Sequence, residues 1–143
     1  MSATTKIKIC GVVNPDMARD CVAMGADMIG LMLYPKSVRA IHLNMAKIIA
    51  AAVIAAGGEP VAVFVEQDIQ AMLAICEFTG VTTVQLHGDQ PRQDHGQLPQ
   101  HIKRIYVLHC DELGMVQADR EGVNLLDAQR DVLLFDGAHS GSG

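Results

Sequence analysis

The chain has 143 residues, half of them hydrophobic, and carries a formal net charge of -5 at neutral pH. This length and composition fit one ordinary domain with a substantial buried core and exclude a disordered chain. The acidic balance, with only two tyrosines, three phenylalanines and no tryptophan, offers no basic or stacking surface for nucleic acid. The most apolar stretch, residues 45–56, is far shorter than the roughly 20 residues that span a bilayer, and residues 1–6 lack the apolar core of a signal peptide. We therefore expect a cytoplasmic protein that binds neither nucleic acid nor a membrane.

The four cysteines show no CxxC pair and no close spacing to histidine, which argues against a zinc knuckle or a redox dithiol. In a reducing cytoplasm we expect free thiols, most of them packed as small buried hydrophobes. The six histidines lack the short spacings of known metal motifs, so no metal site is predicted.

Short runs of branched apolar residues alternate with helical patterns along the whole chain. Residues 6–10 predict a first strand. Asn14 then predicts the cap of a helix, with Pro15 at its first position and Gly25 just beyond its end. The helical spacing places three residues on one face of this helix, namely Met17, Cys21 and Val22.

The next two predicted strands are again separated by a predicted helix. Residues 27–34 form a nearly continuous apolar run, as expected of a parallel strand buried on both faces. Asn44 predicts the cap of an alanine-rich helix that runs to about Ala56 and is stopped by the glycine pair after it. Residues 61–65 predict the third strand.

The second half of the chain continues the alternation with weaker helical signals. Asp68 predicts the cap of a helix whose period of 3.6 places Cys76 inward. Further strands are predicted over residues 82–86, 102–108 and 132–136. Residues 87–100 are polar and poorly periodic and predict at most a short helix, whereas a longer helical region is expected between about residues 111 and 129.

Six strands joined by helices, without a linker or a low-complexity segment, predict a parallel α/β fold. Two architectures fit this pattern. A doubly wound sheet usually carries a glycine-rich phosphate loop after its first strand, where this chain has Gly11 alone. A (β/α)8 TIM barrel needs no such loop, but its eight units take roughly 200 residues or more. We therefore expect residues 1–143 to form a single domain, an incomplete barrel with about six strands of eight that lacks the last two βα units.

The residues at the carboxyl ends of the strands are the candidates for chemistry, because functional groups gather there in parallel α/β folds. Cys10 ends the first strand, Arg39 lies beyond the second, His87 follows the fourth and Asp136 ends the sixth. A thiol and a carboxylate that face each other across a pocket can move a proton on carbon, and an arginine can hold an anionic group through its planar fork. Taken singly, each residue has a simpler interpretation. Cys10 would be a thiol packed in the core and Arg39 a surface charge. His87 would be a loop residue and Asp136 would start a turn. Together they predict an isomerase, a lyase or a binding barrel.

Five segments resemble the phosphoribosylanthranilate isomerase family in order and spacing. They are residues 8–11, 34–39, 63–65, 84–88 and 133–143. The opening KICG and the later QLHG form a combination specific to this family among barrels. The resemblance implies a cofactor-free Amadori rearrangement in tryptophan biosynthesis, which converts N-(5-phosphoribosyl)anthranilate to 1-(2-carboxyphenylamino)-1-deoxyribulose 5-phosphate.

The resemblance also implies the catalytic roles. Asp136 matches the general acid of the family, which protonates the furanose ring oxygen and opens the sugar to a Schiff base. Cys10 matches the general base, which removes the proton from the neighbouring carbon and gives an enolamine that tautomerises to the ketone. A thiol serves as a base near neutral pH when its surroundings lower its pKa, and a carboxylic acid donates there when its own pKa is raised.

Substrate-binding residues follow from the same resemblance. Arg39 matches the residue that binds the anthranilate carboxylate, and His87 is assigned to positioning rather than to proton transfer. Gly141 and Gly143 lie in the glycine-rich loop that follows the family's aspartate and are expected to bind substrate. Val38 stands where the family usually has proline, a departure that touches neither the acid nor the base.

The expected barrel lacks the two strands after which the family's loops hold the substrate phosphate. Six strands leave unpaired edges and a half-open apolar interior, so we expect aggregation or recruitment of a partner. The alternatives to the isomerase are an inactive truncated scaffold or assembly partner of the same fold, and another phosphosugar-binding barrel enzyme, such as an epimerase or an indole-glycerol phosphate synthase. The expected partners are the small phosphosugar-anthranilate substrate and either a second copy of the chain or another tryptophan-pathway enzyme, associated or fused.

Overall fold

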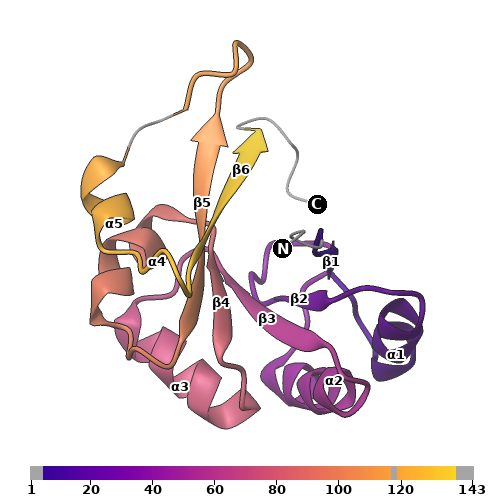
Figure 1. The fold of residues 1–143 in the computed structure, drawn as a ribbon. Helices are drawn as coiled ribbons and strands as arrows, with labels where there is room; N and C mark the ends of the chain where they lie inside the picture. The colour runs from indigo at the N-terminus through magenta and orange to yellow at the C-terminus, as the bar shows by residue number, and fades with distance from the viewer. Residues whose placement is uncertain (1–4, 117–118, 138–143) are drawn as a thin grey trace.

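The computed structural model describes residues 5–116 and 119–137 (Figure 1). Strands and helices alternate along this part of the chain. The strands are β1 (Lys8–Cys10), β2 (Met28–Met32), β3 (Glu59–Phe64), β4 (Thr83–Leu86), β5 (Lys103–Cys110) and β6 (Val132–Gly137). The helices are α1 (Pro15–Ala23), α2 (Leu43–Ala55), α3 (Ile69–Thr79), α4 (Asp89–Asp94), the 3-10 helix η1 (His95–Gln97) and α5 (Arg120–Asn124).

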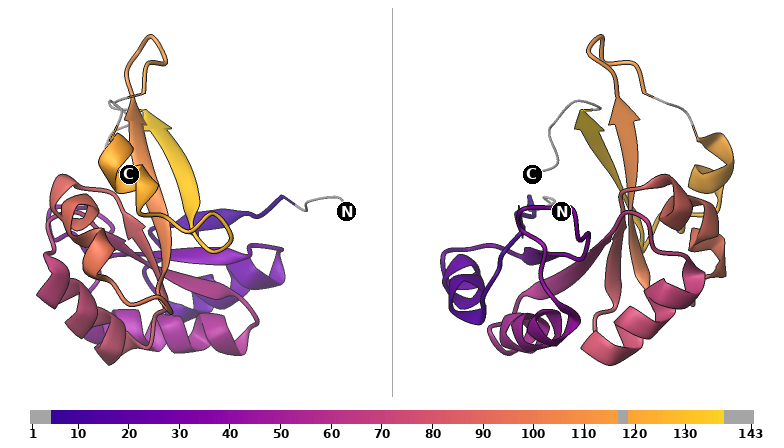
Figure 2. Two further views of the ribbon diagram at one scale, coloured as in Figure 1. Left: turned by 60° about the vertical axis from the view of Figure 1, so that its left-hand side comes forward. Right: turned by 180° about the vertical axis from the view of Figure 1, so that it is seen from behind.

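The six strands are all parallel and pair in chain order, from β1 at one edge to β6 at the other. Figures 1 and 2 show that the sheet is curved and that the helices lie along its outer side. A doubly wound sheet would reverse its strand order at a switch point. The fold is therefore a half-barrel of the α/β type, which confirms the predicted fold class.

Short polar side chains set the starts of α1 and α3. The Asn14 side chain accepts a hydrogen bond from the Met17 backbone N–H at 2.8 Å, and Asp68 caps α3 through the Ala71 backbone N–H at 2.9 Å. Each cap satisfies an N–H that no carbonyl of its own helix reaches. Gly80 ends α3 with a φ of +74°, a left-handed conformation that glycine adopts without steric cost. The predicted caps of these two helices are confirmed.

Two details predicted for the helices are wrong. Helix α2 begins at Leu43 after His42, whose side chain makes no capping hydrogen bond, so Asn44 is inside the helix rather than its cap. On α1 the Met17 side chain is 44% exposed, and Ala18 is the residue buried in the core. The other two residues of the predicted α1 face do pack against the core.

The largest departure from prediction lies between β5 and β6. In place of a long helix between residues 111 and 129, the described part of this segment holds a turn and the short α5. The Asp111 side chain accepts hydrogen bonds from the Leu113 and Met115 backbone N–H groups at 2.9 and 2.8 Å, and Gly114 has a φ of +76°. A short acidic side chain that binds nearby N–H groups competes with the helix for them. Among the described residues, no helix has the length and apolar character needed to cross a membrane.

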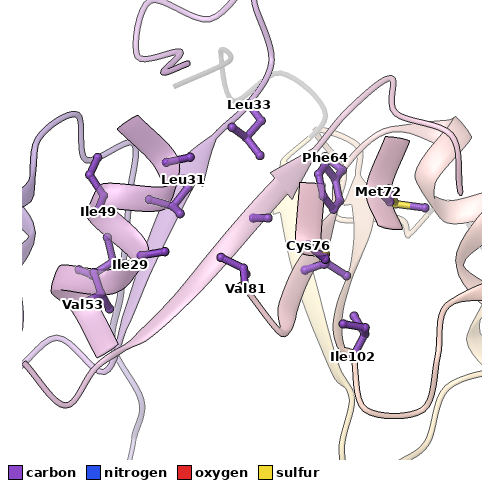
Figure 3. Packing of buried hydrophobic residues seen from close by; sticks show 14 of the residues in the cluster. Ile29, Leu31, Leu33, Ile49, Val53, Phe64, Met72, Cys76, Val81 and Ile102 are labelled. Carbon is purple, nitrogen blue, oxygen red and sulfur yellow. The ribbon is translucent and has the colours of Figure 1, made fainter. Parts of the chain in front are cut away.

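The hydrophobic core lies between the outer face of the sheet and the helices (Figure 3). Ile29, Leu31 and Phe64 of the sheet and Ile49 and Met72 of the helices are fully buried there. Burying one such side chain contributes roughly 1.5–3 kcal/mol. The alternate residues of the central strands face the barrel interior, and the buried ones among them include Val61, Val63, Ile105 and Val107.

The strand ladders are staggered around the sheet. One row of paired residues runs through Cys10, Gly30, Val61, Thr83 and Lys103. The last residue of β1 therefore shares a row with the first residue of β5. Asp136 pairs instead with His109, near the far end of β5. Such a stagger accompanies the strand tilt of a barrel.

A buried ion pair ties the start of β6 to β5. Asp131 has a fully buried side chain, and Arg104, with a side chain 5% exposed, places Nη1 at 3.4 Å from Asp131 Oδ2. Asp131 also accepts hydrogen bonds from the Arg104 backbone N–H at 2.9 Å and from Arg130 Nε and Nη2 at 2.8 Å. Arg104 in turn donates to two backbone carbonyls at 3.1 and 2.8 Å. Although burial opposes it, the hydrogen bonds from Arg130 and from the backbone hold the pKa of Asp131 well below its usual range.

The two edge strands of the described sheet agree with the predicted open edges. β1 and β6 each pair with one neighbouring strand only. The side chains of Val132, Leu133 and Phe135 on β6 are 45%, 42% and 61% exposed. An exposed strand edge with apolar side chains is a template for association, and the β6 edge of the described residues has both features.

Candidate active site

Cys10 lies at the carboxyl end of β1 with its thiol directly over Gly30 of β2. A Cβ atom added to Gly30 would lie 2.7 Å from Cys10 Sγ, so only glycine leaves room for the thiol there. The next residue, Gly11, has a φ of +79° and donates its N–H to the Gly30 carbonyl at 3.0 Å. The chain thus turns sharply just after the thiol and keeps it half-buried at the rim.

Arg39 reaches back from the loop after β2 to the same point. Its Nη1 donates to the Cys10 carbonyl oxygen at 3.5 Å, and its guanidinium packs against Gly11, where a Cβ atom would lie 2.6 Å from Nε. Ser37, buried in the loop, accepts the Arg39 backbone N–H through Oγ at 3.2 Å. The buried Nε of Arg39 has no hydrogen-bond partner among the described residues. The guanidinium therefore keeps donor capacity for an anionic ligand.

His87 and Asp136 form a second part of the rim. His87 Nε2 lies 4.0 Å from Asp136 Oδ2, and the two side chains are 34% and 31% exposed. The His87 backbone N–H donates to the Phe64 carbonyl at 2.9 Å, which holds the start of this loop on β3. Gly88 follows so closely on β3 that a Cβ atom would overlap the Val65 carbonyl oxygen. The backbone therefore fixes the place from which the imidazole reaches Asp136.

His109 on β5 is a member of this cluster that the sequence prediction missed. It pairs in register with Asp136, its Nε2 lies 3.1 Å from the His87 carbonyl oxygen, and its ring meets the His87 ring edge-on with centroids 5.2 Å apart. The predicted fifth strand ends at residue 108, whereas β5 continues to Cys110. Continuing the alternation of β5 by two residues would have placed His109 on the inner face.

Burial is the main cause that lowers the pKa of His87, and the nearby positive or titratable groups His109, Arg92 and Lys8 lower it further. Asp136 acts in the opposite direction. With its pKa below the ordinary histidine value near 6.5, His87 is neutral at pH 7.

A pocket of about 600 Å³ opens beside the histidines. Its ionisable lining residues are Glu66, His87, Asp89, Arg92 and His109. Arg92 is held in place by a hydrogen bond from Nη1 to the Val107 carbonyl at 3.1 Å and by an ion pair with Asp89. Of the predicted site residues described in the structure, His87 lines this pocket, whereas Cys10, Arg39 and Asp136 do not.

Gln85 is a second residue that the prediction missed. It is 5% exposed, and its Oε1 is buried without a hydrogen-bond partner among the described residues. Gln85 shares a row with Val63 and Ile105, so it belongs to the inner face of the sheet. A buried acceptor without a partner costs free energy, and Gln85 Oε1 keeps its acceptor capacity on the inner face of the sheet.

The other thiols differ from Cys10 in their surroundings. Cys76 is buried, as predicted, and burial raises the pKa of its thiol to about 11. Cys21 and Cys110 are half-buried free thiols. Within residues 5–116 and 119–137, no three histidine, cysteine or carboxylate side chains are grouped so as to hold a metal ion.

The structure thus places Cys10 beside Arg39, and His87 beside Asp136, at the carboxyl ends of the strands. Gly141 and Gly143 lie outside the described residues. A parallel half-barrel with its polar groups at this rim defines a protein of the TIM-barrel type.

The chain belongs to the N-(5'-phosphoribosyl)anthranilate isomerase family. The family model described as N-(5'phosphoribosyl)anthranilate (PRA) isomerase matches residues 7–143. The N-(5'-phosphoribosyl)anthranilate isomerase of Chlamydia felis is 43% identical over 111 residues, which are 78% of this chain and 54% of that protein. Isomerase 1 of Arabidopsis thaliana, a chloroplastic protein of the same name, is 34% identical over 139 residues, which are 96% of this chain and 49% of that protein. The chain therefore spans about half the length of the curated relatives it matches.

Solved structures of the same family share the fold. The phosphoribosyl anthranilate isomerase of Thermus thermophilus matches with a TM-score of 0.77 and 28% identity, covering 96% of this chain and 65% of that one. The Thermotoga maritima enzyme matches with a TM-score of 0.75 and 28% identity, covering 98% of this chain and 66% of that one. A further family structure, with a TM-score of 0.73 and 28% identity over 94% of this chain and 66% of that one, holds reduced 1-(o-carboxyphenylamino)-1-deoxyribulose 5-phosphate.

Proposed function

We propose that this chain provides the acid and the base of an aldose-ketose isomerase that acts on N-(5'-phosphoribosyl)anthranilate in tryptophan biosynthesis. The family membership supports the reaction, and the ligand bound in a solved family structure supports the substrate class. The reaction is an internal proton transfer, so the proposal includes no cofactor. We place it in the cytoplasm, with a second copy or another tryptophan-pathway enzyme as the partner at the open edge.

In the proposed mechanism Asp136 donates a proton to the furanose ring oxygen. The bond from C1' to that oxygen breaks, the anilino nitrogen supplies the electron pair, and a Schiff base forms. Cys10, as the thiolate, then removes the proton from C2', and the electrons neutralise the nitrogen to give an enolamine. Tautomerisation of the enolamine gives the ketone, so atoms and charges balance.

The observation that carries the proposal is the position of the Arg39 guanidinium against the backbone of Cys10 and Gly11. An anthranilate carboxylate bound to the spare donors of Arg39 brings the sugar carbons of the substrate close to the thiol over Gly30. Positioning of this kind converts proton abstraction into a step within one complex. His87, whose Nε2 lies 4.0 Å from Asp136 Oδ2, supports positioning of the sugar hydroxyl groups near Asp136.

The test is turnover of freshly formed phosphoribosylanthranilate, followed by the loss of its fluorescence. It is run on this chain and on the chain extended by any sequence that follows Gly143 in its gene. We expect Cys10→Ala and Asp136→Asn each to lower kcat by at least about 100-fold, and Arg39→Lys to raise KM because lysine lacks the bidentate fork. Cys21→Ala, at another half-buried thiol, is the matched control and retains activity. A folded protein that shows no turnover in either form supports the inert-scaffold alternative instead.

A further inference from the structure

We propose that His109 is a positioning residue for the acid half of the site, which fixes the backbone and ring of His87 so that a neutral imidazole faces Asp136. This inference rests on the proposed function, in which Asp136 supplies the proton. It starts from three separate contacts of His109: the ladder pairing with Asp136, the hydrogen bond to the His87 carbonyl and the edge-on ring contact with His87. A surface histidine at a strand end would make none of them.

The hydrogen bond defines the proton on His109. A carbonyl oxygen only accepts, so His109 Nε2, at 3.1 Å from the His87 oxygen, must carry its hydrogen. The same carbonyl belongs to the residue whose ring reaches Asp136 Oδ2 at 4.0 Å. His109 therefore fixes the peptide unit from which the His87 side chain projects. Because His109 pairs with Asp136 in the strand ladder, this hydrogen bond lies at the same level of the sheet as the Asp136 carboxyl group.

The charged and titratable residues around His87 lie on five strands or helices or in the loops beside them. They are Lys8 on β1, Glu66 in the loop after β3, Arg92 and Asp89 on α4, His109 on β5 and Asp136 on β6. With ring centroids 5.2 Å apart, His109 disfavours the charged form of His87, and Arg92 adds to the same effect. Burial acts in the same direction and is the larger cause of the lowered pKa of His87.

The charge of His87 affects the proposed general acid, Asp136. A cationic imidazole 4.0 Å from Asp136 would favour the carboxylate and would hold the catalytic proton back. A neutral imidazole adds no such charge, so no cation at this position opposes the proposed proton transfer from Asp136. His109 thus helps to keep His87 uncharged beside the proposed acid.

Two variants separate this role from simple packing. His109→Gln keeps a donor for the His87 carbonyl but removes the titratable ring, and His109→Phe keeps the ring but removes both donor and charge. His101→Gln, at an exposed histidine just before β5, is the matched control. NMR titration of the His87 ring in the 143-residue chain is the first measurement. We expect the pKa of His87 to rise toward its ordinary value in both His109 variants and to stay unchanged in His101→Gln.

Kinetics provide the second measurement. We expect kcat at neutral pH to fall about tenfold in the His109 variants with little change in KM, and the descending limb of the kcat profile to move to lower pH. An unchanged His87 titration in both folded His109 variants overturns the positioning role. If His87 titrates as expected but no variant and no wild-type protein turns over the substrate, the proposed function fails while the placement of His109 stands.

Discussion

Replacing Asp131 by asparagine tests the ion pair that joins β6 to β5. The substitution keeps the shape of the side chain but leaves Arg104, which is 5% exposed, without its carboxylate. Removing one partner of a buried pair costs about 3–5 kcal/mol, because the remaining charge loses its compensation. Two backbone carbonyls still accept hydrogen bonds from Arg104 at 3.1 and 2.8 Å. We therefore expect a loss in the free energy of unfolding of about 3 kcal/mol, the lower end of that range.

The pH dependence of this loss follows from the lowered pKa of Asp131. The stabilisation is fully present above the ordinary aspartate pKa near 3.9 and is lost as pH falls through the lower pKa of the folded state. The stabilities of the wild-type protein and the Asp131→Asn variant should therefore begin to converge as pH falls below about 4 and become equal only below the pKa of Asp131 in the folded state.

Urea unfolding followed by circular dichroism measures both effects. With a slope of about 2 kcal/mol per molar urea, the midpoint should fall by about 1.5 M at pH 7. Asp20→Asn, at an exposed carboxylate on α1, is the matched control and should leave the midpoint unchanged. A loss below about 0.5 kcal/mol at pH 7, or a loss that stays constant down to pH 3, would refute the reasoning from burial and pairing.

Two further predictions concern His95 and Gly88. Burial and the Arg104 charge lower the pKa of His95, so the free energy of unfolding should fall as pH drops below about 6.5. His95→Leu should reduce that slope in urea titrations without abolishing it, because the pKa of His87 is lowered as well. Gly88 has a φ of -94°, which any residue can adopt, but a Cβ would overlap the Val65 carbonyl. Gly88→Ala should therefore cost about 1–3 kcal/mol by thermal unfolding. The control is Gly96→Ala, whose Cβ would meet only the flexible Leu125 side chain, and an equal loss in both would contradict the steric argument.

The strand positions and the places of Cys10, His87 and Asp136 at strand ends were predictable because they depend on local patterns. Apolar runs bounded by turn residues predicted all six strands to within two residues, and Asn14 and Asp68 marked helix starts through hydrogen bonds to residues three positions away. His42 and Asn44 show the limit of such signals. His42 precedes the apolar helix and Asn44 is its second residue, so the side chain that had the chemistry of a cap is not the one at the boundary.

The contacts across strands were not predictable from the sequence. The cluster of His87, His109 and Asp136 depends on the register of β4, β5 and β6, and a change of one residue in any ladder turns a side chain to the other face. The pair of Arg104 and Asp131 is a similar case, because its two charges are far apart in the chain and meet only when β6 is in place. The turn at Asp111 was readable in principle, since Gly114 follows it, but the apolar residues around it gave a helical pattern.

Because the ladders are staggered, a shift in strand register would disturb the candidate site more than the fold. Cys10 sits in the row that reaches the first residue of β5, while Asp136 is level with His109 near the end of that strand. A slip of two residues in one ladder would leave every side chain on its proper face, yet it would carry Asp136 about 7 Å along the sheet. Such a protein would keep its helix and strand content, while the proposed acid and the proposed base would no longer lie at matching levels of the rim. Spectroscopic folding checks alone are therefore a weak guide to competence in this half-barrel.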